Sequence, residues 1–362
     1  MDRRLTQALA SAEAAGLDAL ALVPGPNLRY ATGLSFHLSE RPIVALLPVD
    51  AQPSIVLPEF EAGKADGFTT FTYTDEDGYA MAYSQACGAL ELADARVGVE
   101  ALQMRLLEAR VLERFAPDIE LVPVDDLYAE LRMVKGPSEL AAMRRAARVA
   151  EDAFVTWVSQ LRAGMTEREA AALLVAGLLG GGADGLSFSP IVASGPNGAL
   201  PHATPGERKF APGDWIVVDW GARVDGYCSD LTRSVVMGEP HGRLAEIHPL
   251  VVAANAAGRA AAAPGEAAED VDAAARAVID EAGYGPQFFH RLGHGLGMEE
   301  HEPPYIVSGN RLRLQPGMTF TVEPGVYLPG VGGVRIEDDV VVTETGVESL
   351  TTLSRAPFVV PV

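Results

Sequence analysis

The feature that most constrains the fold is a pattern that occurs twice in the second half of the chain. RAGMTEREAAALLVAGLLGGGADG at residues 162–185 resembles APGEAAEDVDAAARAVIDEAGYG at 263–285, because each has a glycine turn, an acid-capped helical stretch and a glycine-rich end. Similarly, APGDWIVVDWG at 211–221 resembles QPGMTFTVEPG at 315–325, a Pro-Gly turn that leads into a strand with one acid. The duplicated helix and hairpin predict a pseudo-twofold domain in which equivalent acids meet at the centre.

The repeated strands carry Asp219 and Glu323 at matching positions, and each is followed by a second acid, Asp230 or Glu337. The letters RVDG between the first two acids indicate a hairpin turn, which can bring the acids opposite one another across the strands. A solvated face or an arginine partner would explain one such acid. Four such acids on apolar strands, however, would repel one another unless a cation lies between their carboxylates. With one histidine, such a site favours manganese, iron, cobalt or zinc.

The length of 362 residues allows two domains. Residues 1–130 alternate helical patterns with short apolar runs such as PIVALLP and PSIVLP, which predicts a small α/β domain. After Gly136-Pro137 a long stretch with helical periodicity begins. We therefore predict an α+β domain, the one containing the repeat, over residues 131–362.

Charge and hydropathy exclude several classes of partner. Lys and Arg number 28 against 49 Asp and Glu, and the net charge of -21 repels nucleic acid and anionic membranes. No apolar run approaches the ~18 residues of a membrane span, and the N-terminus predicts an amphipathic helix rather than a signal peptide. Cys87 and Cys228 are too few for a disulfide framework. We expect a soluble, cytoplasmic protein with reduced thiols.

A histidine-rich stretch, HRLGHGLGMEEHEPP at residues 290–304, lies between the acid-bearing segments. His290 and His294 have the spacing of a helical metal pair, but the glycines around them disfavour a helix. We expect a strand or loop with close backbone approach instead. The GHGLG letters also resemble a phosphate-binding loop, yet the Lys-Ser/Thr continuation is missing and the neighbours are acidic. A histidine of this stretch is thus a candidate metal ligand.

Five residues, each in its own short motif, resemble the metal ligands of the pita-bread dinuclear metallopeptidases: Asp219, Asp230, His294 in GHGLG, Glu323 in EPG and Glu337 in RIED. That family includes Xaa-Pro dipeptidase (prolidase), aminopeptidase P and methionine aminopeptidase. NLRYATG at 27–33 and VKGPSEL at 134–140 are similar to its proline-specific branch, so the resemblance covers nearly the whole chain. It implies a pita-bread catalytic domain after a creatinase/prolidase-type N-terminal domain.

The resemblance also implies how these residues act. Asp230 and Glu337 would bridge two divalent ions, with manganese favoured and cobalt or zinc as alternatives. Asp219 would chelate one ion, and His294 with Glu323 would complete the other. A hydroxide held between the ions would attack the scissile carbonyl, and Glu323 would accept its proton.

Further residues are expected to face the substrate. His202 in LPHATPGE resembles the family's histidine near the leaving group, and His301 resembles the one that contacts the substrate carbonyl or amide. His290 resembles a histidine that faces the carboxyl end of the leaving proline. A hydrogen-bonded core position is the alternative for each of the three. Arg335 is expected to orient a ligand carboxylate, with a surface salt bridge as the alternative.

Specificity is the last question that the sequence addresses. Methionine aminopeptidase normally lacks such an N-terminal domain and creatinase lacks the ligand set, which leaves prolidase and aminopeptidase P. A dipeptide presents a free carboxylate after its proline, and arginine is the preferred partner for a carboxylate. Arg41, in FHLSERPIVALL, is the candidate, although a loop arginine is more often only solvated. We favour an Xaa-Pro dipeptidase, with aminopeptidase P as the alternative and a non-catalytic binding protein as a remote one. The resemblance also suggests a homodimer.

Overall fold

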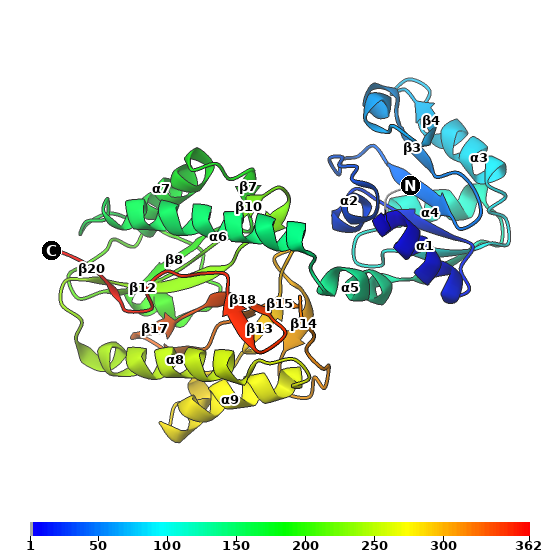
Figure 1. Ribbon diagram of the computed structural model, residues 1–362. Coiled ribbons are helices and arrows are strands. Elements are labelled where there is room, and N and C mark those ends of the chain that lie inside the picture. The colour runs from blue at the N-terminus through cyan, green and yellow to red at the C-terminus, as the bar shows by residue number, and fades with distance from the viewer. Residues whose placement is uncertain (1–2) are drawn as a thin grey trace. The chain divides into compact units, whose positions relative to one another are not determined.

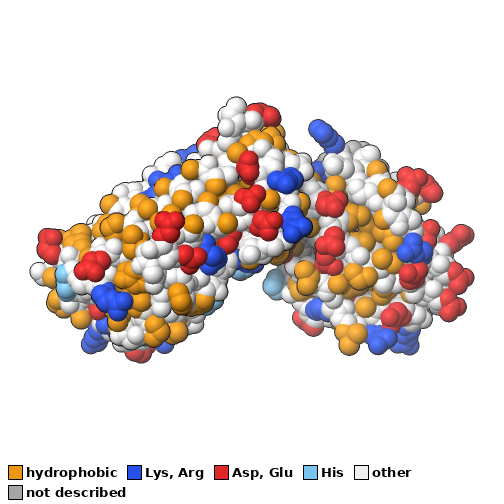
Figure 2. Space-filling model, turned by 90° about the horizontal axis from the view of Figure 1, so that it is seen from below, with side chains coloured by type: hydrophobic (Ala, Val, Ile, Leu, Met, Phe, Trp, Pro, Cys, Tyr) orange, Lys and Arg blue, Asp and Glu red, His pale blue; other side chains and the backbone are white. Residues whose placement is uncertain are grey.

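The computed structural model describes residues 3–362 and divides into two compact units (Figure 1). The first unit ends at Arg132 and the second begins at Met133. Within the described residues, none of the helices combines the length and the apolar character needed to cross a membrane. Figure 2 shows acidic side chains scattered over both units on the face it presents, with hydrophobic side chains between them.

The first unit is built on a mixed six-stranded sheet with the strand order β4-β3-β2-β1-β5-β6. Strands β1, β5 and β6 run parallel, as do β3 and β4, whereas β2 is antiparallel to both of its neighbours. Its elements are α1 (Arg3–Ala14), β1 (Ala19–Leu22), α2 (Pro26–Thr32), β2 (Val44–Pro48), β3 (Ser54–Pro58), a 3-10 helix (Glu59–Lys64), β4 (Thr69–Tyr73), α3 (Ala80–Ala89), β5 (Arg96–Val99), α4 (Leu106–Phe115), β6 (Glu120–Pro123) and α5 (Asp125–Met133).

Helices cover both faces of this sheet. Leu20 and Leu22 pack into a core with α1, α2 and α5, whereas Ala19 and Ala21 belong to a second core with α3 and α4. Successive side chains of a strand point to opposite faces, so strands buried on both sides become continuous apolar runs. This is the small α/β arrangement that the alternating sequence patterns predict.

The second unit contains two larger sheets, with the strand orders β20-β12-β9-β8 and β14-β13-β15-β18-β19. Its elements are α6 (Pro137–Val158), α7 (Glu167–Gly180), β7 (Gly185–Leu186), β8 (Ile191–Ser194), β9 (Trp215–Trp220), β10 (Ala222–Val224), β11 (Tyr227–Cys228), β12 (Leu231–Met237), α8 (Gly242–Ala261), α9 (Ala268–Glu281), β13 (Gly293–Gly295), β14 (Glu302–Ile306), β15 (Thr319–Val322), β16 (Gly325–Leu328), β17 (Gly332–Arg335), β18 (Asp338–Val342), β19 (Val347–Ser349) and β20 (Phe358–Val360), with 3-10 helices at Gly195–Ala199 and Gly285–Gln287.

The repeat seen in the sequence is present in three dimensions. Helices α7 and α9 each have 14 residues, and the residue before each helix forms an isolated bridge, Thr166 to Lys209 and Ala267 to Arg313. Strands β9 and β12 form one antiparallel pair and β15 and β18 the other. Helices α6 and α7 lie on one side of these strands and α8 and α9 on the other (Figure 1). The predicted pseudo-twofold domain is therefore confirmed.

Two local predictions can be checked on the backbone. The letters RVDG form the turn between β10 and β11, where Asp225 and Gly226 have φ of 52° and 82°. Positive φ at both central residues is typical of a type I′ hairpin. The histidine-rich stretch is not helical, because Gly293–Gly295 is the strand β13. Both observations agree with the turn chemistry and the glycine content of the sequence.

Candidate metal centre and substrate pocket

The four acids lie at the ends of the paired strands. Asp219 belongs to β9 and is paired in register with Thr232, whereas Asp230 precedes β12 by one residue. Glu323 directly follows β15, and Glu337 directly precedes β18. The prediction that Asp219 and Asp230 are directly opposite one another was wrong. The β10–β11 hairpin is inserted between them, and the register shifts Asp230 beyond the paired part of β9.

The two halves of the repeat meet beside these acids. Thr232 and Glu337 form an isolated β-bridge, in which the Glu337 amide donates to the Thr232 carbonyl at 3.2 Å. The Thr232 hydroxyl donates to Glu337 Oε2 at 2.6 Å. The Asp230 amide donates across the junction to Asp339 Oδ2 at 3.0 Å. Contacts between residues more than a hundred positions apart thus position both acids.

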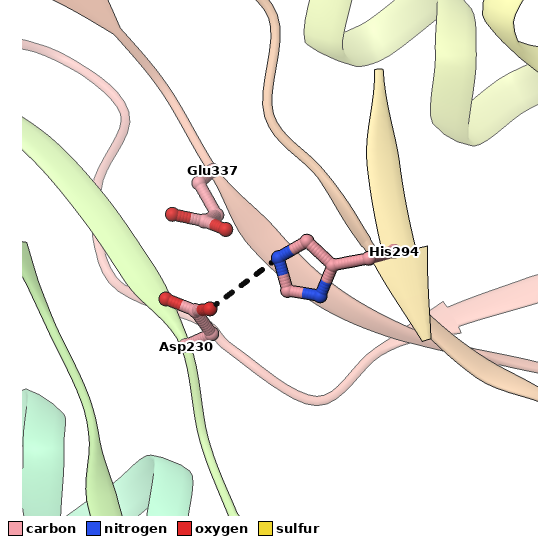
Figure 3. A group of neighbouring side chains, drawn as sticks. All are labelled: Asp230, His294 and Glu337. Carbon is pink, nitrogen blue, oxygen red and sulfur yellow. Dashed lines mark ion pairs between the residues drawn. The ribbon is translucent and has the colours of Figure 1, made fainter. Parts of the chain in front are cut away.

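Asp230, His294 and Glu337 form the tightest group of potential ligands. One ligand atom from each lies within 4.8 Å of the others, and all three side chains are buried (Figure 3). His294 Nε2 lies 3.7 Å from Asp230 Oδ2 and 3.3 Å from Glu323 Oε1, so Glu323 adjoins the same group. The segments before β12 and β18 and the strand β13 therefore converge on one point.

The orientation of His294 follows from its strand. Its Nδ1 lies 3.1 Å from the carbonyl oxygen of Gly295, which identifies Nδ1 as the donor and leaves the Nε2 lone pair toward the acids. A Cβ at Gly293 would lie 1.9 Å from the carbonyl oxygen of Thr321, and one at Gly295 2.3 Å from that of Pro303. Only glycine permits this close approach of backbones. The glycines around His294 therefore have the role that the sequence suggested.

The carboxylates are short of partners and repel one another. Within residues 3–362, the buried Oδ1 atoms of Asp219 and Asp230 have no hydrogen-bond partner. Burial, followed by the charges of the neighbouring acids, raises the pKa values of Asp230 and Glu337 well above their usual range. Burial and then Asp219 raise the pKa of Glu323 to about 7, against the opposing effect of Arg335. A cation would relieve both conditions, and oxygen donors with one imidazole suit borderline divalent ions.

Arg335 lies at the edge of this group and is only 2% exposed. Its Nη2 donates to Asp219 Oδ2 at 2.5 Å, and its Nε donates to the Thr232 hydroxyl at 3.0 Å. A third bond runs from Nη1 to the Tyr327 hydroxyl at 2.9 Å. The guanidinium therefore contacts one candidate ligand directly and a second, Glu337, through Thr232.

A pocket of about 580 Å³ opens over the acids, within the range of about 300–1,000 Å³ that is common for small-molecule sites. All five candidate metal ligands and all three candidate substrate histidines belong to its wall. The remaining wall consists of Phe188, Ser189, Pro190, Ile191, Pro201, Ala203, Thr204, Pro205, Arg291, Glu300 and Arg335. A mostly apolar wall with convergent polar groups is what a peptide fragment requires.

Both ring nitrogens of His290 are engaged. Nδ1 lies 2.7 Å from the Arg291 carbonyl oxygen and must donate to it, so Nε2 accepts a hydrogen bond from the Tyr327 hydroxyl at 3.1 Å. Burial, and then the charge of Arg335, lower the pKa of His290 to about 4. His290 is thus a neutral ring that offers the pocket its apolar surface rather than a free N–H.

The other two histidines are more accessible. The His301 ring lies against the His294 ring with a centroid distance of 4.0 Å. Burial and then the charge of Arg291 lower the pKa of His301, although its ring is partly exposed. His202 is exposed on the segment between β8 and β9. Both are placed where a bound peptide can contact them.

Arg41 belongs to the first unit and has partners there. Its Nε and Nη2 donate to the two oxygens of Asp75 at 2.7 and 2.8 Å, and its Nη1 donates to Glu40 at 2.6 Å. The bidentate face that would hold a substrate carboxylate is therefore occupied by Asp75.

Sequence reasoning missed several residues at the site. Arg291 stands in the quoted histidine stretch, next to His290, and its position in that stretch was the available signal. Thr232 and Tyr327, whose hydroxyls bond to Arg335, and Asp339, which accepts from the Asp230 amide, have no comparable signal. Their partners are distant in the sequence, so no local pattern connects them to the acids.

Comparison with known proteins adds to this geometry. The model of metallopeptidase family M24 matches residues 141–344, and that of the creatinase/prolidase N-terminal domain matches residues 4–134. The chain is 38% identical to the probable dipeptidase PepE of Mycobacterium tuberculosis, over 99% of this chain and 96% of that protein. Among solved structures, a prolidase of Thermococcus sibiricus has a TM-score of 0.94 at 34% identity, covering 99% of this chain and 100% of the other. An X-Pro aminopeptidase of Thermotoga maritima has a TM-score of 0.85, also at 34% identity, covering 97% and 100%.

Proposed function

The chain belongs to metallopeptidase family M24, and on this premise we propose that it hydrolyses the Xaa-Pro bond of dipeptides. The observation that carries the proposal is the convergence of Asp230, His294 and Glu337 within 4.8 Å in the wall of a pocket. Family M24 implies divalent metal ions, and these buried, mutually repelling side chains suit them. The names of the dipeptidase and prolidase relatives support the class of substrate.

The proposed metal ligands follow the geometry. Asp230 and Glu337 would help to hold both ions, because they come from the two repeats and each offers a ligand atom within 4.8 Å of the other. Asp219 is assigned to one ion, and His294 with Glu323 to the other. Manganese is the favoured ion, with cobalt or zinc as alternatives. Divalent cations held there would supply water of lowered pKa as the nucleophile and positive charge for the developing oxyanion.

The chain's own residues would move protons and hold the peptide. Glu323 is proposed to accept the proton of the nucleophile, because its carboxylate lies beside His294 and is buried in the pocket wall. His301 is proposed to contact the substrate carbonyl or amide, and His202 the leaving group. The neutral His290 ring is proposed to pack against the proline. Arg335 would hold Asp219 in the orientation that ligation requires.

Two activities are compatible with the relatives, since both a prolidase and an X-Pro aminopeptidase resemble the chain closely. We favour the dipeptidase because the dipeptidase name also occurs for a relative that covers almost the whole chain. Aminopeptidase P activity on longer Xaa-Pro peptides is the alternative. A cytoplasmic homodimer is part of the proposal, and sedimentation analysis of the full chain would test the oligomeric state.

The proposal is tested by release of the N-terminal residue from Ala-Pro and from Ala-Pro-Ala, with added manganese, cobalt or zinc. We expect metal-dependent turnover and a higher kcat/KM for Ala-Pro. Preference for the tripeptide would reverse the choice in favour of aminopeptidase P. Absence of turnover of both peptides with every metal would refute an Xaa-Pro peptidase.

A further inference from the structure

The pocket wall contains two arginines in opposite situations. Arg335 is 2% exposed and bonded to Asp219, Thr232 and Tyr327. Arg291 is half-buried, and within residues 3–362 its guanidinium forms no hydrogen bond or ion pair. An arginine placed in a pocket without an acidic partner is available to a ligand. Arg291 is the only such cation in the wall formed by the described residues.

Aromatic stacking holds Arg291 in place. Its guanidinium carbon lies 4.6 Å from the centroid of the Tyr305 ring. Tyr305 on β14 is paired in register with His294 on β13, so the guanidinium lies over the residue opposite a candidate metal ligand. Stacking occupies a face of the guanidinium plane but leaves its N–H edge free for a bidentate partner.

Arg291 lines the same pocket as the five candidate metal ligands. The rest of the site is rich in carboxylates, which repel an anionic group of a substrate. A dipeptide that ends in a free carboxylate therefore needs one cation in the wall of the pocket.

We propose that Arg291 binds the free carboxylate of the substrate's C-terminal residue and thereby selects dipeptides over longer peptides. This inference rests on the proposed function and assigns the group that recognises the C-terminal carboxylate of the substrate. The two other candidates for carboxylate binding already have partners. The guanidinium of Arg41 donates two hydrogen bonds to Asp75, and His290 is neutral with both ring nitrogens hydrogen-bonded. Arg291 has the charge, the donors and the position that the role requires.

Arg291→Met removes the charge but keeps an unbranched side chain against Tyr305. Wild-type and variant proteins are compared on Ala-Pro and on Ala-Pro amide, which differ only in the carboxylate. We expect the variant to lose about 10- to 100-fold in kcat/KM on Ala-Pro, chiefly through KM, the range for one charge-assisted pair. Turnover of the amide should fall far less than that of Ala-Pro. Arg311→Met is the matched control, since Arg311 is a surface arginine, 88% exposed, in the same unit.

Equal losses on both substrates, or no loss on either, would overturn the inference. A separate measurement distinguishes this failure from failure of the proposed function. Calorimetric titration of the manganese-loaded full chain with L-proline and with L-prolinamide tests carboxylate binding without turnover. We expect proline to bind at least about tenfold more weakly to Arg291→Met than to wild type, with prolinamide unaffected. If the wild type binds proline in this way but hydrolyses no Xaa-Pro peptide, only the proposed function fails; equal proline affinity in both proteins overturns the assignment of Arg291.

Discussion

The two halves of the second unit use one scaffold for different purposes. In the first half, α7 precedes the antiparallel pair β9 and β12; in the second, α9 precedes the pair β15 and β18. Each half places one acid at the end of its first strand and another just before its second. The carboxylates of the candidate metal centre therefore come from the parts that the halves share.

The single imidazole among the candidate ligands comes from a position at which the halves differ. Asp219 pairs with Ile191 on β8, and the Glu323 amide correspondingly donates to the Leu292 carbonyl beside β13. Two residues after Ile191 the first half has Ala193, and two residues after Leu292 the second half has His294. Equivalent backbone positions thus hold an apolar side chain in one half and a metal-ligand candidate in the other, which makes a symmetric scaffold into an asymmetric site.

The segments that carry the candidate substrate histidines also differ. In the second half, the β13–β14 pairing positions the stretch from His290 to His301. In the first half, one buried carboxylate, Glu167 at the start of α7, holds the segment of His202. It accepts from the Ser194 amide and hydroxyl at 2.8 and 2.7 Å and from the Gly206 amide at 3.1 Å. The comparison teaches that the shared strands supply the carboxylates, whereas the unshared segments supply the histidines that line the pocket.

The largest expected effect tests whether the paired acids are equivalent. Asp219→Ala and Glu323→Ala should each lower kcat/KM on Ala-Pro by more than about 10³-fold, because the several kcal/mol of transition-state stabilisation that a metal supplies would be lost. Steady-state kinetics and metal content by mass spectrometry measure the outcome. Glu348→Ala, at an exposed acid on β19, is the control. Activity within tenfold of wild type for either variant would contradict its assignment.

The raised pKa values predict how pH acts on the metal-free protein. The pKa of Glu323 is about 7 in the folded protein, against 4.5 for the ordinary carboxyl group of the unfolded chain. Between these two pH values, folded Glu323 keeps a proton that the unfolded chain has released. Because the folded state binds more protons in this range, the free energy of unfolding falls as pH rises from about 4.5 to about 7. At about 1.4 kcal/mol per pKa unit, the fall amounts to roughly 3 kcal/mol. Asp230 and Glu337 extend the fall to higher pH.

With metal bound, the proposed ligand carboxylates would be ionised, and this dependence of stability on pH should disappear. Urea denaturation of metal-free and manganese-loaded protein at pH 5, 6, 7 and 8 makes the measurement. A metal-free protein whose stability is constant or rises over this range would show that the acids of the two halves are not brought together as described.

The next effect concerns the different anchoring of the two halves. Glu167→Gln replaces one acceptor oxygen with an NH2 group, which donates but cannot accept, so the His202 segment should shift and kcat/KM should fall by about 10- to 100-fold. Glu169→Gln is the matched control, because Glu169 lies in the same helical turn but bonds only to Thr166. In a His202→Ala background the Glu167 effect should largely vanish. Additive losses would mean that Glu167 acts elsewhere than on His202.

The smallest effect compares the starts of the two equivalent helices. Thr166 caps α7 by accepting from the Glu169 amide at 3.1 Å, whereas α9 begins after Ala267, which has no side-chain cap. Thr166→Ala should therefore lower the free energy of unfolding by about 1 kcal/mol, and Ala267→Ser should raise it by up to about 1 kcal/mol. Urea denaturation gives both values. A loss of stability in Ala267→Ser would show that the α9 start has no room for the cap that α7 uses.

Much of this architecture follows from local sequence patterns. The duplicated helices, the hairpin turn at Asp225-Gly226 and the non-helical strand at His294 were predicted, because turn chemistry, helix capping and glycine content act within a few residues of the chain. The five ligand motifs were recognisable for the same reason, since each is a short stretch around one acid or histidine. The sequence alone thus determined the class of fold and the set of candidate ligands.

Only the tertiary structure decided which side chains are committed and which are free. Asp219 is paired with Thr232 rather than Asp230, and His290 is bonded to Tyr327. Arg335 is tied to Asp219 from 116 positions away, whereas Arg291, in the middle of the quoted histidine stretch, has only the Tyr305 ring. Burial and hydrogen bonding depend on neighbours that folding brings together, and no local pattern encodes them. For this reason the charge available to a substrate could be found only in the folded chain.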